Sequence, residues 1–183
     1  MENQSINTID NCDLKETDLN IDNFSYQLDL TKKLDALSGD FDQDIINEIV
    51  LWKVSRYARL SEVTIELLNK IEMQSHEIDM ELTRSILNAL LNSKGIGLPI
   101  ASTILRFKNP EVYQIIDQRV YRFLYGHTVK YPRKQNEIST LYINYLRDLK
   151  TKCNEHSIPF RCADRILYLA DKRLNKGIPL DGY

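Results

Sequence analysis

The stretch SKGIGLPIASTIL, residues 93–105, decides the fold because it joins two helix-forming segments through a tight glycine turn. Gly95 and Gly97 can adopt positive φ angles and carry no Cβ, so another molecule can approach the backbone closely there. Pro99 suits the first turn of a helix, where its missing N–H costs nothing. The stretch therefore predicts a helix, a glycine hairpin and a second helix over residues 80–105.

Two interpretations of this turn are open. A helix that starts after Gly97 exposes unpaired N–H groups and the positive end of its dipole, which is a natural site for a phosphate. In that case Lys94, Gly95 and Gly97 are candidate contacts to a nucleic-acid backbone. In the simpler alternative, a glycine ends the first helix as a C-cap and the second helix starts in the ordinary way.

Apolar residues recur at helical spacing in most of the remaining chain, and no run alternates with the period of a strand. The predicted helical segments are 42–53, 61–73, 79–93, 109–116, 135–153 and 161–174. This pattern predicts an all-α, compact helical domain. Residues 1–25 lack periodicity and are rich in Asn and Asp, so we expect a flexible acidic arm followed by a single helical domain over residues 26–183.

The composition is that of an intracellular globular protein. The three cysteines are too few and too scattered for a disulfide framework, a zinc site or an iron–sulfur cluster. They are Cys12, Cys153 and Cys162. The polar, acidic start does not resemble a secretory signal, and no apolar stretch is long enough to span a membrane. We therefore expect a cytoplasmic protein with no membrane partner.

Charge is distributed unevenly along the chain. Residues 1–45 hold 11 Asp and Glu against 3 Lys, whereas residues 46–183 hold 21 Lys and Arg against 15 acids. The strongest basic excess, in 106–134, favours a polyanionic partner. Its basic residues are Arg106, Lys108, Arg119, Arg122, Lys130, Arg133 and Lys134. A solvated surface that binds nothing is the alternative interpretation of the same charges.

A single aspartate follows the turn at a suggestive distance. In FKNPEVYQIIDQRVYRFLYG, residues 107–126, Asp117 lies twenty positions after Gly97 and directly after Ile115 and Ile116. A glycine hairpin followed at this spacing by an aspartate in such an apolar context resembles the helix-hairpin-helix (HhH-GPD) DNA glycosylase superfamily. The resemblance extends over about 80–126, and the chain looks like a small bacterial branch without an iron–sulfur cluster.

The resemblance implies a chemistry for this aspartate. Cleavage of an N-glycosidic bond builds oxocarbenium character on the sugar, and the carboxylate of Asp117 would stabilise that charge or activate a water. The base would leave the stack of double-stranded DNA and enter a pocket. Pro99 stands where strand-nicking members of the superfamily carry a lysine, so a monofunctional glycosylase is implied. We expect no cofactor, and the hairpin is a candidate site for a monovalent cation.

Other residues have both a functional and a structural interpretation. Asp117 is also well placed to be the N-cap of a helix that starts at residue 118. Arg119 and Arg122 share a helix face beside it and are candidate DNA contacts, with a surface ion pair as the alternative. Lys53 and Arg56 are candidate phosphate or pocket contacts, or a solvated pair.

The sequence thus leads to one main hypothesis, a DNA base-excision enzyme that acts on a damaged or modified base. Its main rival is a non-enzymatic DNA-binding module that has the hairpin but no usable pocket. A scaffold whose basic surface binds an acidic protein is a third possibility.

Overall fold

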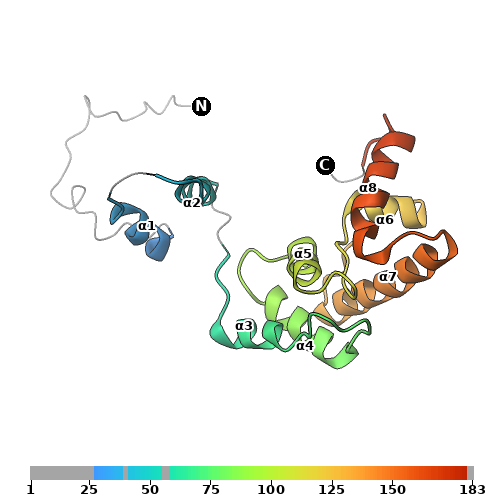
Figure 1. The fold of residues 1–183 in the computed structure, drawn as a ribbon, viewed down its shortest axis with the longest axis horizontal. Coiled ribbons are helices and arrows are strands. Elements are labelled where there is room, and N and C mark those ends of the chain that lie inside the picture. Colours follow the sequence, from blue (N-terminus) through green and yellow to red (C-terminus); the bar gives the residue numbers. More distant parts are fainter. Residues whose placement is uncertain (1–26, 39–40, 55–57, 181–183) are drawn as a thin grey trace, which may run out of the picture. The chain divides into compact units, whose positions relative to one another are not determined.

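The structure is a computed structural model that describes residues 27–38, 41–54 and 58–180 of the 183-residue chain. Every regular element in these ranges is a helix, which confirms the predicted all-α class (Figure 1). Contacts within the chain divide it into two compact units, residues 1–57 and 58–183. The candidate site lies in the second unit.

The described residues of the first unit form two helices that are linked by a side-chain hydrogen bond. They are α1 (Leu28–Asp35) and α2 (Gln43–Lys53). Asp42 caps α2 by accepting the N–H of Ile45. The indole N–H of Trp52 donates to the hydroxyl of Thr31 at 2.8 Å, so the end of α2 is tied to α1. These contacts place α1 and α2 together in one unit, whereas the sequence had predicted a single domain from residue 26 onward.

The second unit consists of six α-helices and a short 3₁₀ helix among its described residues. They are α3 (Glu62–Asn69), α4 (Met80–Leu91), α5 (Leu98–Lys108), α6 (Gln118–Tyr125), α7 (Gln135–Glu155), η3 (Phe160–Cys162) and α8 (Ala163–Leu174). In Figure 1, α7 runs next to α4, and α8 lies beside α6. Apolar faces of α4, α5 and α7 meet in the core, and the largest fully buried side chains include Ile86, Leu87, Leu90, Leu105, Tyr142 and Tyr145.

Two helices leave apolar side chains exposed and bury polar ones. On α3, Val63 is 65% exposed and the buried positions are Thr64 and Leu68. On α8, Ile166 is 38% exposed, and the helix instead buries two aspartates with its apolar residues. The buried residues of α8 are Ala163, Asp164, Leu167 and Asp171. The face that a helix buries thus depends on the residues that pack against it. For α8 these include the buried side chains of Arg106 and Arg122.

The helix predicted over residues 109–116 is wrong. Asn109 ends α5, and its side-chain oxygen accepts the N–H of Glu111 at 2.9 Å, so the chain makes one turn and then runs without helical structure to Asp117. The amide group of Asn109 also donates to the carbonyls of Glu72 and Ser75. Asn109 is fully buried, and these contacts outside its own segment compete with helix formation.

The turn between α4 and α5 uses its two glycines differently. Gly95 has a φ of +82°, in the left-handed region that side chains disfavour. Gly97 has a φ of −95° and a ψ of 175°, and is the N-cap of α5. The side chain of Ile96, between them, is buried in the core. Only Gly95 therefore needs the conformational freedom that the sequence attributed to both glycines.

This difference predicts opposite effects of one substitution at two neighbouring sites. Gly95→Ser should lower the free energy of unfolding by about 1 kcal/mol, because a Cβ strains a left-handed backbone even though no atom lies within 4 Å of it. Gly97→Ser should raise it by roughly 0.3 kcal/mol, because serine is a good N-cap and its Cβ meets only Pro99 Cδ, at 3.8 Å. Urea unfolding of both variants measures the two changes, and a loss of equal size at both sites would contradict the assignment.

Candidate nucleic-acid interface

The start of α5 is open to solvent and carries no cap from a side chain. The exposed residues around it are Lys94, Gly95, Gly97, Pro99 and Ile100. The N–H of Ala101 bonds to the carbonyl of Gly97, and Pro99 has no N–H. The N–H groups of Leu98 and Ile100 make no hydrogen bond to any described residue. They can therefore bind an anion, and no acidic side chain lies in the first turn to oppose it.

A buried hydroxyl links this helix to the segment that carries Asp117. Ser102 is fully buried, donates its hydroxyl to the carbonyl of Pro99 at 2.8 Å and accepts the N–H of Ile116 at 3.2 Å. The second turn of α5 is thus fixed against the residue before Asp117. The structure brings the glycine turn and the aspartate, which the sequence had connected only by spacing, into one part of the domain.

The irregular segment before Asp117 is held by two side chains from α7 and by a backbone N–H of α8. The phenol groups of Tyr142 and Tyr145 donate to the carbonyls of Gln114 and Ile115, at 2.9 and 2.7 Å. The side chain of Gln114 accepts the N–H of Asp164 at 3.2 Å. Burial raises the pKa values of Tyr142 and Tyr145 well above the usual value, so both hydroxyls stay protonated and remain donors. The segment is therefore fixed by several hydrogen bonds and positions Asp117 firmly.

Asp117 is the N-cap of α6, as the structural interpretation of the sequence had predicted. Its Oδ1 accepts the N–H groups of Arg119 and Val120, at 2.8 and 3.0 Å. Among the described residues, none donates a hydrogen bond to Oδ2. The residue is half-buried, so one carboxylate oxygen fixes the side chain and the other can still contact a bound molecule.

Arg122 does not have the role expected for it. Its side chain is 8% exposed and bonds to Asp171 through Nε at 2.9 Å and Nη2 at 2.7 Å. Its Nη1 donates to the carbonyls of Ile178 and Pro179. The proposed contact between Arg122 and DNA is therefore corrected: all three nitrogens of the guanidinium bond inside the protein, where they attach α8 and the following chain to α6.

The backbone and the side chain of Arg119 make different contacts. Its backbone N–H bonds to Asp117, but its guanidinium forms an ion pair with Asp171 at 3.2 Å and lies over the ring of Tyr168. The side chain is 31% exposed. Arg119 thus restrains the carboxylate through its backbone, and its guanidinium remains a candidate DNA contact only at its exposed edge.

Asp171 is the residue of this site that sequence reasoning missed. It is fully buried and accepts hydrogen bonds from Arg119, Arg122 and Asn175. Burial opposes its ionisation, but the hydrogen bonds from Arg122 and Asn175 outweigh that effect, so the pKa of Asp171 lies below its usual value. A signal was present in the sequence, since Asp171 falls four residues after Leu167 on the buried stripe of its helix. A charge at such a position indicates a buried ion pair.

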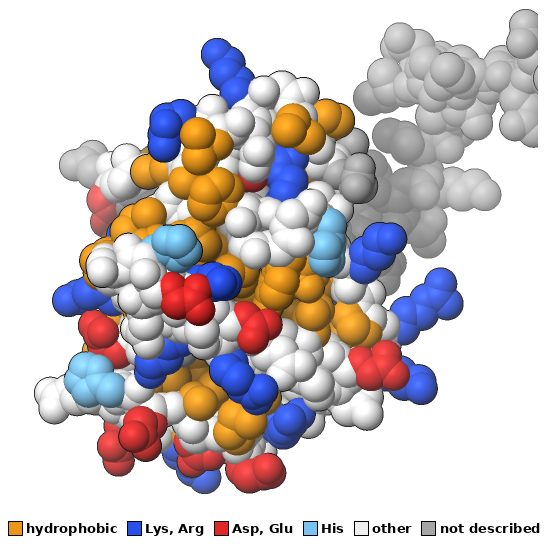
Figure 2. All heavy atoms as spheres, turned by 90° about the vertical axis from the view of Figure 1, so that its right-hand side faces the viewer, with side chains coloured by type: hydrophobic (Ala, Val, Ile, Leu, Met, Phe, Trp, Pro, Cys, Tyr) orange, Lys and Arg blue, Asp and Glu red, His pale blue; other side chains and the backbone are white. Residues whose placement is uncertain are grey.

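Two other basic side chains also contact residues of the same domain. Arg106 is buried and pairs with Asp164 at 3.5 Å, and Lys108 donates to the side chain of Asn69 at 3.0 Å. Lys130 and Arg133 are exposed. Figure 2 shows the face near α6, α7 and α8, where Lys and Arg side chains alternate with acidic ones and with hydrophobic patches. The basic excess of the sequence therefore does not become a continuous basic surface on this face.

The remaining candidates lie in the first unit or outside the described residues. Lys53 is exposed at the end of α2. Arg56 lies outside the described residues. Of the cysteines, Cys153 is buried and Cys162 half-buried, and both are free thiols. The described ranges contain no group of three or more His, Cys, Asp or Glu side chains that could hold a metal ion.

Tyrosines near Asp117 form an aromatic cluster. The rings of Tyr121 and Tyr125 lie 4.4 Å apart, and the ring of His127 lies 5.6 Å from that of Tyr121. The hydroxyl of Tyr125 donates to Asp148 at 2.7 Å, and burial together with this bond raises the pKa of Tyr125. Tyr121 is buried and Tyr125 half-buried, so Phe123, which is 38% exposed, is a better candidate than these tyrosines for stacking on a base.

The two cavities described in this part of the chain lie elsewhere. One has a volume of about 310 Å³ and lies between α7 and the loop before α4, and the other has a volume of about 260 Å³ and lies between that loop and Tyr113. Neither is lined by Asp117. None of the described helices is long and apolar enough to cross a membrane. Comparison of the chain with protein-family models, curated proteins and solved structures found no match.

The Arg122–Asp171 pair predicts a pH-dependent loss of stability. Asp171→Asn should lower the free energy of unfolding by about 3 kcal/mol at pH 7, because it leaves the buried guanidinium of Arg122 without its counter-charge. The pKa of Asp171 is lower in the folded protein, so its contribution is complete above the unfolded pKa of about 3.9 and disappears as the pH falls through the folded value. The difference between wild type and variant, measured by urea unfolding, should therefore shrink below about pH 4.

A matched control is Glu137→Gln, which removes one acid from an exposed pair with Lys134. Exposed pairs of this kind contribute little, so its unfolding curve should match that of the wild type. A difference for Asp171→Asn that stayed constant from pH 7 to pH 3 would contradict the role of its charge.

Proposed function

We propose that residues 58–180 form a DNA-binding domain that removes a damaged or modified base from double-stranded DNA. The uncapped start of α5 would bind a phosphate, and Asp117 would stabilise the positive charge that develops on the sugar as the N-glycosidic bond breaks. Pro99 offers no amine for attack on the sugar, so the product would be an intact abasic strand.

The observation that carries this proposal is the hydrogen bond between Ser102 and Ile116. It couples the helix whose start is open to an anion to the residue before a half-buried carboxylate with one unbonded oxygen. A glycosylase needs both elements in a fixed relation, because the phosphate contact sets the register of the sugar over the carboxylate. The charge of the second unit also suits DNA, since residues 58–183 hold 19 Lys and Arg against 14 Asp and Glu.

A non-enzymatic DNA-binding module is the second candidate. It is favoured by the position of the two described cavities, neither of which borders Asp117. In that case Asp117 serves only as the N-cap of α6, and the start of α5 binds DNA without any reaction. The two candidates share the phosphate contact and differ in whether a base is released.

The shared phosphate contact predicts the effect of a charge at the turn. Gly97→Glu should weaken binding to any duplex about tenfold, because the new carboxylate repels the phosphate and phosphate contacts carry no sequence information. Fluorescence anisotropy with a labelled duplex measures the affinity. For the wild type on undamaged DNA we expect a Kd of ~10⁻⁶ M or weaker that rises steeply with salt.

The control for this variant is Gly97→Gln, which adds the same length of side chain without the charge. It should retain most of the wild-type affinity, and circular dichroism should show the same helix content for both variants. Unchanged binding by Gly97→Glu would remove the turn from the interface. An equal loss in both variants would attribute the effect to size instead of charge.

The enzymatic candidate predicts a specific defect in Asp117→Asn. Asparagine caps a helix as well as aspartate, so the fold and DNA binding should persist while base release falls by about 10²-fold or more. The assay uses duplexes that each carry one lesion: an oxidised guanine, an alkylated purine, a mispaired adenine or another modified base. Free base and alkali-labile strands are scored for wild type and variant.

Asp79→Asn is the matched control, because Asp79 caps α4 in the same way by accepting the N–H of Leu82 at 2.9 Å. It should leave base release unchanged. Borohydride added during the reaction should trap no protein–DNA adduct, as a monofunctional enzyme requires. If the wild type released no base from any duplex that it binds, the DNA-binding module would be the correct function.

A further inference from the structure

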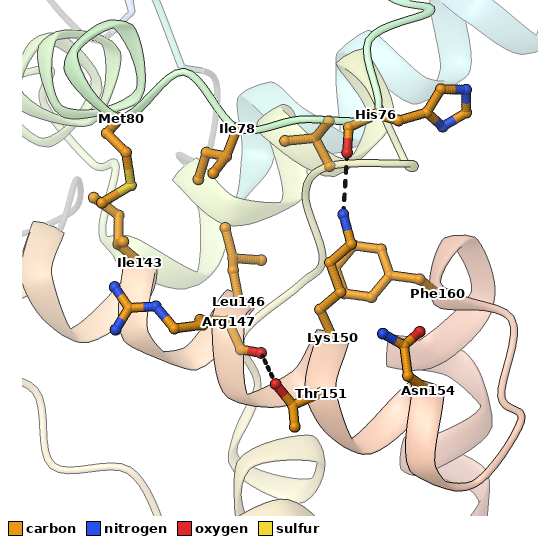
Figure 3. A pocket seen from close by; sticks show the side chains of 11 residues that line it. His76, Ile78, Met80, Ile143, Leu146, Arg147, Lys150, Thr151, Asn154 and Phe160 are labelled. Carbon is orange, nitrogen blue, oxygen red and sulfur yellow. Dashed lines mark hydrogen bonds between the residues drawn. The ribbon is translucent and has the colours of Figure 1, made fainter.

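The larger of the two cavities described above has the form of a small-molecule site. It lies between α7, the loop before α4 and η3 (Figure 3). Its floor is apolar and buried, formed by Val112, Ile143 and Leu146, and Phe160 lies at one side. Its volume of about 310 Å³ is at the lower end of the range found for ligand pockets, roughly 300–1,000 Å³.

A lysine bridges one side of this cavity. The ammonium group of Lys150 donates to the backbone carbonyl of His76 at 3.0 Å and lies 5.8 Å from the centre of the Phe160 ring. Figure 3 shows this bond bridging from α7 to the loop that carries His76. The bond therefore joins α7 to this loop across one side of the cavity.

The charged side chains that line the cavity are all cationic. Eleven residues line it, and none of them is acidic, whereas His76, Arg147 and Lys150 are basic. The guanidinium of Arg147 makes no hydrogen bond or ion pair with any described residue, and the side chain is exposed. In Figure 3 it extends from α7 alongside Ile143, at the edge of the apolar floor. An unpaired cation beside a buried apolar surface suits a ligand with an apolar body and an anionic end.

We propose that this cavity binds a small amphiphilic carboxylate, with its apolar body on Ile143 and Leu146 and its carboxylate on the guanidinium of Arg147. The volume equals that of roughly ten water molecules, so the apolar body contains about ten heavy atoms. Lys150 supplies a second positive charge while it supports the loop. This site is separate from the proposed DNA contacts and does not rest on the proposed function.

The experiment compares two probes that share an apolar body and differ in charge. They are 4-phenylbutyrate and its neutral counterpart 4-phenylbutan-1-ol, each titrated into the full chain with ¹³C-labelled Ile, Leu and Met methyl groups. For a ligand of this size we expect a Kd of about 1 mM for the carboxylate. The methyl signals of Ile78, Met80, Ile143 and Leu146 should shift, and the alcohol should bind five- to tenfold more weakly because it lacks the charge-assisted bond to Arg147.

Arg147→Met tests the cation directly. This exposed position should tolerate the change, and the variant should bind both probes with the affinity of the alcohol. Arg133→Met is the control, since it removes the same charge from an exposed position that does not line the cavity, and it should keep the full preference for the carboxylate.

Each other result overturns the proposal. The cavity is not a ligand site if the four methyl signals do not respond to either probe at concentrations of about 10 mM, ten times the expected Kd. The anionic ligand class is wrong if the wild type binds the two probes equally. The role of Arg147 is wrong if Arg147→Met keeps the preference, or if Arg133→Met loses it equally, because the effect then reflects net charge alone.

Discussion

The chain between α5 and α6 runs through the interior of the second unit without regular structure, and its buried backbone groups must find hydrogen-bond partners elsewhere. Three hydroxyl groups provide them: Ser102 accepts the N–H of Ile116, and Tyr142 and Tyr145 donate to the carbonyls of Gln114 and Ile115. Since these hydroxyls come from α5 and α7, the segment also ties those two helices together. The direction of the chain at Asp117, and with it the start of α6, depends on this set of bonds.

The position of α6 in turn fixes α8. Arg122 and Arg119 leave α6 on one side and meet the buried carboxylate of Asp171 on α8. A charge buried without a partner costs several kcal/mol, so this pair determines which face of α8 packs inward. As a result, Arg119 and Arg122, two cations of the basic segment, serve in holding the helices together. Fewer cations are therefore free for the proposed DNA contact than the sequence suggested.

The two candidate binding sites of the domain differ in physical character. The start of α5 offers backbone N–H groups and an exposed lysine, which suit a hydrated phosphate at the surface. The cavity beside α7 offers a buried apolar floor with a cation at its edge, which suits a ligand that gains most from leaving water. Both lie in the second unit and share no residue among those that we have assigned to them.

Much of the architecture followed from the sequence alone, for local reasons. Helical periodicity identified most of the helix pattern, and Asp117 was recognised as a possible N-cap, because amphipathicity and capping act within a few residues. Gly95 and Pro99 likewise defined the turn before α5. What only the tertiary structure decided involves partners far apart in the chain. Residues 109–116 form no helix because Asn109 bonds to Glu72 and Ser75, Arg122 is buried because Asp171 meets it from 49 residues away, and one side of the cavity is bridged by Lys150 and the carbonyl of His76, 74 residues apart. A local pattern carries no information about such partners, since burial and pairing arise only when distant segments pack together.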